Sequence, residues 1–461
     1  MGEEPAANVN AGGPIQRARD RVVSDADEML RALGLKSVDD LFADVPASVR
    51  AALDLAPGVS ELEAVTRITE ILAANRSMDD MPMFLGSGVY DHFVPASVRA
   101  ITSRSEFYTA YTPYQPELSQ GILQALWEYQ SLVCELTGMD AANTSLYDAS
   151  TALGEAALMS RRIHGGDVFL IPRAIRWNRR SVLQNYLLGG GLRVRDVDYD
   201  RGTGMLDLAR LKEALTPDVC GVYVESPNFF GRLEEQVEEV RAMAREAVLV
   251  VGINPIAQAV LKPPGDFGAD IVIGEGQALG NPPNFGGPLL GVFACRQEHV
   301  RKMPGRVIGL TRDVKGHRAF CMTLQTREQH IRREKAMSNI CTNESLLAVA
   351  AAAYMAVLGS NGLRSVAADN IRRARDLAAA IDRIDGYVAP LFKGAHFNEF
   401  TVRAKKGYER VRKGLLEHGV HGGIALKRYL PELEDVALFT TTERHRPEHY
   451  ERLLTALEDL A

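Results

Sequence analysis

The chain has 461 residues, of which 46% are hydrophobic and 24% are charged, and its formal net charge at pH 7 is −6. Such a length is too great for one hydrophobic core and indicates two or three domains of ordinary globular composition. The mildly acidic balance argues against nucleic-acid binding, which requires a basic surface.

Cysteine spacing and apolar runs argue against a zinc-binding, secreted or membrane-spanning protein. None of the five cysteines lies within four residues of another, so we expect no metal site, and their odd number favours reduced thiols in a cytoplasmic protein. The first 20 residues contain no apolar segment of the kind found in signal peptides. The longest apolar run, 345–359, is alanine-rich and too short for a membrane span. We expect it to form a buried helix that Thr342 caps and Gly359 ends.

The N-terminal part of the chain is expected to form an arm. Residues 1 to about 15 are a candidate mobile tail, and residues 24–76 show the charged, apolar-periodic pattern of short surface helices. We expect this arm to cross a neighbouring chain or to cover the next domain. A glycine turn at Gly86 and Gly88 follows, and Pro95 then starts a short helix.

An aromatic turn comes next, with the sequence YTAYTPYQPELSQG at residues 108–121. Pro113 and Pro116 exclude regular structure and place Tyr108, Tyr111 and Tyr114 on a rigid irregular segment. Such a segment suits a surface that holds a flat or polar molecule. By residue type alone, however, we favour core or interface aromatics.

Two helices follow the aromatic turn. Apolar residues recur at helical spacing from Ile122 to Leu136, and Gly138 ends that run. After a short strand or loop, Asp148, Ser150 or Thr151 can cap an alanine-rich helix. A helix N-terminus lined with hydroxyl groups is also a candidate anion site, but plain capping is the interpretation that we favour.

Strands and helices alternate between residues 166 and 296. The expected strands are 167–172, 192–200, 220–227, 248–254, 269–276 and 289–296, and the expected helices between them are 178–188, 206–215 and 234–247. This alternation predicts βαβ units and a mostly parallel sheet. The segment from Glu225 to Asn228 ends one strand, where α/β sheets place ligands, although we favour a plain turn there.

The pattern changes after about residue 360. A charged helix at 363–384 leads into three expected strands, within 396–404, 423–427 and 436–443, with helices at 406–418 and 448–460. This mixture predicts a small α+β domain. We therefore expect an arm at 1–80, a large α/β domain at 81–340, and a linking helix with the small domain at 341–461.

Three parts of the chain carry a resemblance to a known family. They are YTPYQPELSQG at 111–121, NFGGP at 284–288, and MPGRVIGLTRD at 303–313 with QTREQHIRREKAMSNICTNESLL at 325–347. Together they resemble the amino-terminal half of the P protein of the glycine cleavage system, which in some bacteria and archaea is a separate polypeptide, subunit 1. The resemblance covers roughly residues 1–450. It implies the fold of type I pyridoxal-phosphate (PLP) transferases, with a large α/β domain around a mostly parallel seven-stranded sheet, an N-terminal helical arm and a small C-terminal α+β domain.

The residues that would hold the cofactor in that fold are missing. The resemblance implies a lysine after the strand at 269–276 and an acidic residue at the end of the strand at 248–254. These positions hold Gln277 and Ala278 in the first case and Asn254 in the second, and no lysine occurs between Pro263 and Arg301. Without a primary amine no imine can form, and an amide cannot supply the negative charge that keeps the pyridinium protonated. We therefore expect no covalently bound cofactor in this chain, and the resemblance places PLP on subunit 2.

The resemblance implies one enzyme built from two kinds of chain. With subunit 2, this chain would decarboxylate glycine and transfer the aminomethyl group to the lipoyl group of the H protein, as a heterotetramer of two of each subunit. The residues expected to complete the partner's pocket are Tyr111, Tyr114 and Gln115. The residues expected in a close-approach loop or a basic partner-binding cluster are Asn284, Gly286, Gly287, Arg327 and His330. For the basic cluster, a solvated helix face is the alternative.

Two other functions stay open at this point. The chain could be a non-catalytic scaffold or a regulatory paralogue that kept the fold and lost the site. It could also be an autonomous PLP enzyme of the transaminase or sulfur-lyase type that uses a displaced lysine. Lys262 is the nearest candidate for that lysine, but it precedes Pro263 and Pro264 and lies on the wrong side of the strand.

Overall fold

The computed structural model describes residues 25–51 and 54–461, which fall into two compact units, one ending at Asn75 and one spanning Arg76–Ala461. The tail predicted for residues 1–15 lies outside the described residues. The domain boundaries predicted at residues 80 and 340 stay predictions.

The first unit consists of short helices, as predicted. It is helical at 25–32, in η1 (Val38–Phe42), in η2 (Ala47–Val49) and in α2 (Glu61–Leu72). The Ser60 side chain caps α2 by accepting a hydrogen bond from the backbone of Glu63. None of its described residues is buried, so this unit has no core of its own.

A seven-stranded sheet organises the second unit. Its order is β1-β7-β6-β5-β4-β2-β3; neighbours among β2 to β6 are parallel, whereas β7 is antiparallel to β6 and β1 to β7. The strands are β1 (Ala141–Ala142), β2 (Val168–Pro172), β3 (Arg193–Val197), β4 (Val219–Ser226), β5 (Val248–Ile253), β6 (Ile271–Glu275) and β7 (Gly291–Cys295). The mostly parallel seven-stranded sheet that the resemblance implied is therefore confirmed.

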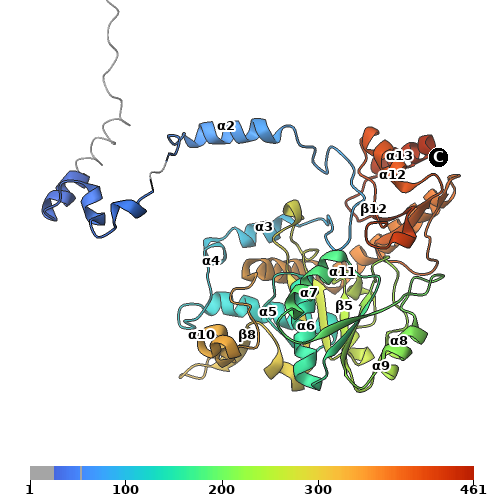
Figure 1. The fold of residues 1–461 in the computed structure, drawn as a ribbon, viewed down its shortest axis with the longest axis horizontal. Coiled ribbons are helices and arrows are strands. Elements are labelled where there is room, and N and C mark those ends of the chain that lie inside the picture. The colour runs from blue at the N-terminus through green and yellow to red at the C-terminus, as the bar shows by residue number, and fades with distance from the viewer. Residues whose placement is uncertain (1–24, 52–53) are drawn as a thin grey trace, which may run out of the picture. The chain divides into compact units, whose positions relative to one another are not determined.

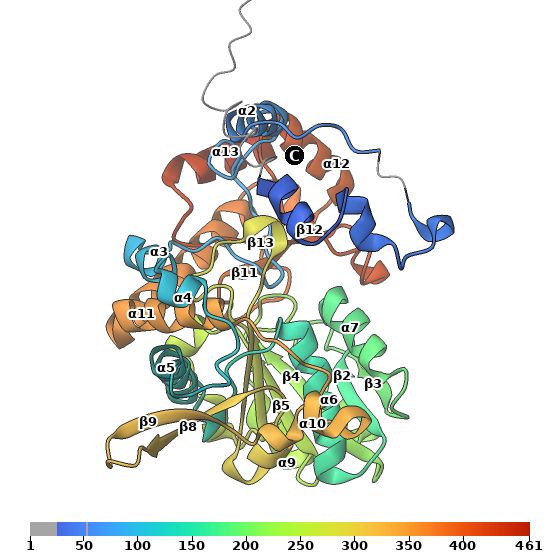
Figure 2. The same cartoon turned by 90° about the vertical axis from the view of Figure 1, so that its left-hand side faces the viewer.

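Helices cover both faces of this sheet, which explains the apolar strands (Figures 1 and 2). Successive residues of a strand point to opposite faces. In β5, Leu249 and Val251 belong to one core, which holds α5 (Gln120–Thr137) and the first part of α11 (Ser345–Asp382). Val248 and Val250 belong to the other core, under α6 (Ala149–His164) and α7 (Trp177–Leu187).

The ends of α5 and α6 follow from local chemistry. Gly138 ends α5 in the left-handed conformation, with φ of 67°, as its position predicted. Of the three candidate caps for α6, Asp148 is the one that lies at the N-cap. Its carboxylate accepts the Thr151 N–H at 2.6 Å, and the Thr151 hydroxyl bonds back to the cap.

Helix α11 differs from the prediction at both ends of the apolar run. The predicted cap, Thr342, is wrong, because the helix begins at Ser345 after Glu344. Gly359 is the one non-helical residue within Ser345–Asp382, with φ of 60° and ψ of −175°, and helical structure resumes beyond it. Among the described residues α11 alone is long and apolar enough to cross a membrane, but Ala348–Ala352 are buried in the core beside α5. Packing of this kind accounts for its apolar composition.

The small α+β arrangement predicted near the C-terminus is confirmed. Four antiparallel strands form a second sheet in the order β10-β11-β13-β12. They are β10 (Tyr387–Val388), β11 (Glu399–Ala404), β12 (Ile424–Ala425) and β13 (Val436–Thr440), and they pack with α12 (Tyr408–Glu417) and α13 (Pro447–Leu460). Figure 1 shows these elements at the red end of the chain.

One hairpin was not predicted at all. Strands β8 (Val307–Arg312) and β9 (Arg318–Thr323) pair antiparallel outside the large sheet, and Figure 2 shows them projecting from it. The hairpin lies against α5, where the Gln120 side chain donates to the Phe320 carbonyl at 2.8 Å and Gln130 to the Ile308 carbonyl at 3.0 Å. Two buried or half-buried glutamines therefore hold its backbone, while Ile308, Phe320 and Met322 pack into the core beside α5.

Several short elements complete the second unit. They are α3 (Ala96–Thr102), α4 (Ser105–Tyr108), α8 (Leu208–Ala214), α9 (Val237–Met243), α10 (Gln329–Arg332), η3 (Ala257–Ala259), η4 (Pro264–Phe267), η5 (Asn284–Gly286), η6 (Gln297–Lys302), η7 (Gln325–Arg327), η8 (Arg333–Lys335) and η9 (Pro431–Leu433). The helix that Pro95 was predicted to start is α3. Tyr108 was placed on the irregular segment but ends the one-turn helix α4, so that segment begins after it. The helix predicted at 234–247 is limited to α9.

Candidate active site

The carboxyl ends of three neighbouring strands meet where open α/β sheets bind ligands. Strand β4 ends at Glu225 and Ser226, β5 runs into Asn254, and β6 ends at Glu275, followed by Gln277. We call the space above these three ends the crevice. Its lining includes Asn254 and Glu275, together with residues of α7 and of the 88–90 segment.

Gln277 is fixed within this crevice by the backbone. Its side chain is fully buried, accepts a hydrogen bond from the Tyr90 N–H at 2.9 Å and donates to the Tyr90 carbonyl at 2.9 Å. The same amide nitrogen also donates to the Asn281 carbonyl at 2.5 Å. Ala278, beside it, is buried as well. The amide of Gln277 therefore links the strand end to the 88–90 segment.

A buried cluster of charges fills the crevice next to Gln277. Arg176 donates to Glu225 Oε1 at 2.6 Å and to Glu399 Oε2 at 3.0 Å, and Tyr90 donates to the same Glu399 oxygen at 2.8 Å. Arg179, in α7, also pairs with Glu225. All five side chains are at most 5% exposed. Burial opposes the charge on Arg176, but Tyr90 and the two carboxylates outweigh it and raise the pKa of Arg176.

A further carboxyl group occupies the start of α6. Glu275 accepts the Ala149 N–H at 3.1 Å through one oxygen, and the Leu290 and Gln277 N–H groups at 2.9 and 3.1 Å through the other. Burial raises the pKa of Glu275 to about 7, although these backbone hydrogen bonds favour the ionised form. The helix N-terminus that was a candidate anion site thus already has a carboxyl group against it.

A second polar cluster joins two predicted groups of site residues. Tyr114 Oη accepts a hydrogen bond from Arg306 Nη2 at 3.1 Å, and its ring packs edge-on against His330 with centroids 5.8 Å apart. Arg306, 7% exposed, also donates to Asn343 Oδ1 at 3.4 Å, and Glu328 lies 3.6 Å from its Nε and 3.7 Å from His330 Nδ1. We call these five residues the tyrosine–arginine cluster. It brings the aromatic turn together with the basic segment.

The other residues of the aromatic turn lie at the surface. Tyr108 and Tyr111 are 70% and 75% exposed, and Tyr114 is 44% exposed. Gln115 is exposed as well. The interpretation of the tyrosines as core aromatics of this chain is therefore wrong, and their role at an interface or a ligand stays a prediction.

The predicted loop and Arg327 lie in different surroundings. Asn284 and Gly286, with φ of 41° and 98°, lie in an exposed loop around Phe285, whose ring is entirely exposed, and Gly287 follows in an extended conformation. Arg327 bonds to the carbonyl of Gly305 at 3.0 Å and to other carbonyls within 300–305. Its guanidinium therefore stabilises that turn of the backbone, and burial lowers its pKa.

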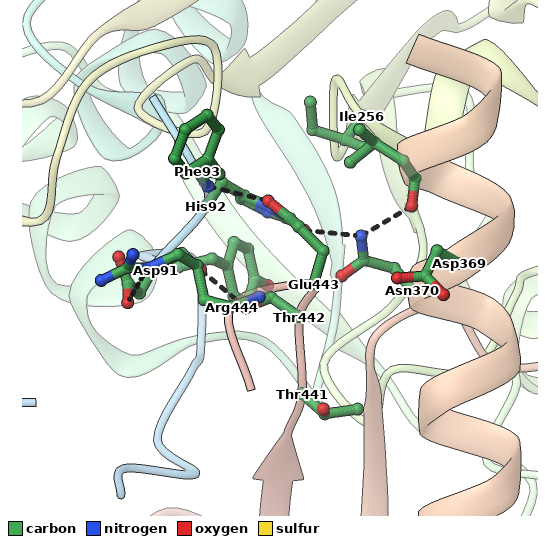
Figure 3. A network of polar contacts seen from close by, with 12 residues as sticks. Asp91, His92, Phe93, Ile256, Asp369, Asn370, Thr441, Thr442, Glu443 and Arg444 are labelled. Atoms are coloured by element: carbon green, nitrogen blue, oxygen red, sulfur yellow. Dashed lines mark hydrogen bonds and ion pairs between the residues drawn. The ribbon is translucent and has the colours of Figure 1, made fainter. Parts of the chain in front are cut away.

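A third network connects the small sheet with the rest of the second unit (Figure 3). Glu443 accepts hydrogen bonds from His92 Nδ1 at 2.9 Å, the Phe93 N–H at 2.8 Å and Asn370 Nδ2 at 3.0 Å. Burial alone would raise the pKa of Glu443, but His92, Asn370 and the Phe93 N–H outweigh it and lower that pKa to about 2. This carboxylate therefore ties the segment before α3 and helix α11 to the end of β13.

Comparison with known proteins identifies the family. The model of the glycine cleavage system P-protein family matches residues 20–457. The chain belongs to this family. It is 46% identical over 439 residues to a probable glycine dehydrogenase (decarboxylating) subunit 1 of Thermococcus onnurineus, covering 94% of this chain and 97% of that one. A relative of the same name from Desulfitobacterium hafniense is 45% identical over 441 residues, covering 95% and 98%.

Solved structures agree with the fold. A crystal structure of glycine decarboxylase, the P-protein of the glycine cleavage system, in inhibitor-bound form matches with a TM-score of 0.87 at 40% identity, covering 94% of this chain and 98% of that one. A sphingosine-1-phosphate lyase of Burkholderia pseudomallei matches with a TM-score of 0.64 at 14% identity, covering 90% and 93%, which is a likeness of fold alone. The predicted PLP-transferase fold class is confirmed.

Pyridoxal phosphate does not fit the crevice of this P-protein chain. Gln277 offers no amine, Asn254 offers no negative charge, and the free space that remains is about 10 Å³, roughly the room that one water molecule needs. Within the described residues, moreover, no group of three or more His, Cys, Asp or Glu side chains could hold a metal. We therefore derive no chemical step through a cofactor in this crevice.

Most of the buried charges had escaped prediction. Arg176, Arg179 and Glu399 come from segments far apart in the chain, and single charged residues carry no periodic signal. Glu225 had been singled out, but with a preference for a turn, and the structure buries it at the end of β4. For Arg306, the available signal was its place in the run MPGRVIGLTRD.

Proposed function

We propose that this chain is subunit 1 of a glycine dehydrogenase (decarboxylating) of the glycine cleavage system. Together with subunit 2 it decarboxylates glycine and transfers the aminomethyl group to the lipoyl group of the H protein. Subunit 2 carries the PLP, and this chain completes the pocket from across the interface. The 45–46% identity to relatives named as subunit 1, over nearly their whole length, supports this proposal.

The tyrosine–arginine cluster is the observation that carries the role of this chain. Arg306 is 7% exposed and Tyr114, which holds it, is 44% exposed, so the phenol lies at the boundary between buried charge and surface. In this proposal Tyr111, Tyr114 and Gln115 face the partner's pocket and orient the substrate. Arg306 keeps the Tyr114 hydroxyl in one direction. Such positioning matters because a displacement of about 1 Å can lower a rate by ~100-fold.

The remaining predicted residues have supporting roles in the proposal. The loop with Asn284, Gly286 and Gly287 approaches the partner, since its exposed Phe285 suits burial at an interface. His330, packed on Tyr114, keeps the aromatic turn against the basic segment. Arg327 acts indirectly: it hydrogen-bonds to the backbone of residues 300–305, which directly precedes Arg306.

The assembly proposed is a heterotetramer of two copies of each subunit in the cytoplasm. An enzyme that divides one site between two chains requires a lasting contact, so the interface between the subunits should exceed ~2,000 Å². The first unit of the chain, in which none of residues 25–51 and 54–75 is buried, suits such a contact. The H protein would bind transiently.

Reconstitution tests this function directly. Subunit 2 from the same source is purified and assayed for glycine–bicarbonate exchange with and without this chain. We expect exchange to require both subunits, because the pocket is incomplete without the tyrosine–arginine cluster. Full activity of subunit 2 alone would overturn the proposal and favour the alternative, a non-catalytic scaffold or regulatory paralogue.

A further inference from the structure

The crevice of this chain shows more than the loss of a lysine. Its arginines and carboxylates are paired with one another, although Arg176 Nε and Glu225 Oε2 make no hydrogen bond of their own. The strand ends, α6 and α7 all contribute residues to the crevice. A site that had lost its ligand without replacement would leave a cavity, which destabilises the fold, whereas the free space here is only about 10 Å³. The three strand ends and the start of α6 are held together by groups of the chain itself.

Glu275 is one of these groups. Its carboxyl group accepts the first N–H of α6, from Ala149, and two further backbone N–H groups from Leu290 and Gln277. A helix N-terminus with converging N–H groups binds anions such as phosphate. Here a carboxyl group of the chain itself occupies that place, because Glu275 is the last residue of β6 and only 8% exposed.

The charges in the crevice are also balanced without a bound anion. Arg176 and Arg179 contribute two positive charges, while Glu225, Glu399 and Glu275 contribute up to three negative charges. The two arginines are already paired with Glu225 and Glu399 at hydrogen-bond distance. No surplus positive charge is left to attract a phosphate.

We propose that the crevice holds a built-in substitute for the cofactor, with Glu275 in the place of a phosphate group and the Arg176–Glu225–Glu399 cluster in the place of the ring. The substitute keeps the crevice closed to phosphorylated ligands, so a lysine restored at position 277 does not by itself restore PLP binding. This inference rests on the family fold and not on the proposed role beside subunit 2, so either can fail alone.

A close approach of the backbone beside the crevice adds to this picture. A Cβ atom at Gly86 would lie 1.8 Å from Thr440 Oγ1 and 2.4 Å from Glu399 Oε1. Glu399 begins β11 of the small sheet, and it bonds to Tyr90 and Arg176 on the large-sheet side. The charge cluster therefore ties the small sheet to the large one, through Glu399 of β11 and Glu225 of β4.

The first arm of the test restores the lysine. The full-length Gln277→Lys chain and the wild type are incubated with PLP and desalted, and the cofactor content and any borohydride-sensitive visible absorbance are measured. We expect background values for both proteins. Uptake of one PLP per chain by Gln277→Lys would overturn the proposal.

The second arm removes the built-in anion and does not depend on whether Gln277→Lys folds. Inorganic phosphate is titrated into wild type, Glu275→Ala and the exposed control Glu298→Ala while Tm is recorded. We expect Tm of Glu275→Ala to rise by roughly 2 °C with phosphate, because a ligand that binds only the folded state stabilises it. Wild type and Glu298→Ala should not respond. If phosphate fails to distinguish Glu275→Ala from the wild type, the proposal is wrong. The exchange assay with wild-type chain is unaffected by either result and reports separately on the proposed function.

Discussion

Removing the hydroxyl group of Tyr114 tests the proposed role of this chain most directly. It accepts a hydrogen bond from Arg306 Nη2 at 3.1 Å, and Arg306 is only 7% exposed. Tyr114→Phe keeps the ring against His330 and removes only this acceptor. Loss of a hydrogen bond to a charged group costs about 1.5–3 kcal/mol. Because Tyr114 is 44% exposed, water can replace part of the lost bond, and we expect about 1 kcal/mol of destabilisation.

The effect on the reaction should exceed the effect on folding. If the hydroxyl is oriented by Arg306 to act in the shared pocket, Tyr114→Phe should lower glycine turnover at least ~10-fold, or about 1.4 kcal/mol of transition-state stabilisation. The assay is glycine–bicarbonate exchange by the reconstituted pair, with Tm of this chain and assembly on a sizing column as controls.

Tyr111→Phe provides the matched comparison. Tyr111 is 75% exposed, and its hydroxyl makes no side-chain hydrogen bond within the part of the chain that the structure describes. Its substitution should therefore leave Tm unchanged, while turnover falls if this phenol also reaches the pocket. Wild-type rates in both variants would remove the tyrosines from the site and leave them as interface packing.

Further predictions concern stability, colour and assembly. Arg176→Met should lower the free energy of unfolding by about 3–5 kcal/mol in chemical denaturation, since it leaves Glu399 buried without its cation. Arg179→Met should cost less, because Arg176 still pairs with Glu225. Equal losses in the two variants would contradict this assignment of ion pairs. The pKa of Glu443 is about 2 in the fold against an ordinary 4.5, so its contribution, on the order of 3 kcal/mol, is present above pH 4.5 and lost as pH falls towards 2. Glu443→Gln should therefore flatten the fall of unfolding free energy in acid, and an unchanged slope would refute this. The purified wild-type chain should be colourless, and a stoichiometric PLP content would show otherwise. Co-expressed subunits should elute together at micromolar concentration, and free separation would exclude the heterotetramer.

Local patterns predicted much of the fold because they report which face of each element is buried. Helical spacing from Ile122 to Leu136 and the glycine at 138 match α5, and the apolar run at 248–254 matches β5. The hairpin β8–β9 escaped prediction because its contacts with α5 depend on distant residues: Gln120 and Gln130 each bond to both the N–H and the carbonyl of one hairpin residue. The prediction that Thr342 caps α11 was wrong because the type of a capping residue does not show which of several neighbouring residues starts a helix.

Part of the candidate site could likewise be predicted from the sequence, and part could not. A missing amine is a property of one position, so the sequence by itself determined that Gln277 cannot form an imine, and its motifs determined the family. Only the tertiary structure decided what replaces the cofactor, because Arg176 meets Glu399 across 223 residues and Glu275 reaches Ala149 across 126. Whether a buried charge is paired depends on how distant segments pack, and it is that packing which closed the crevice and brought Tyr114 to Arg306.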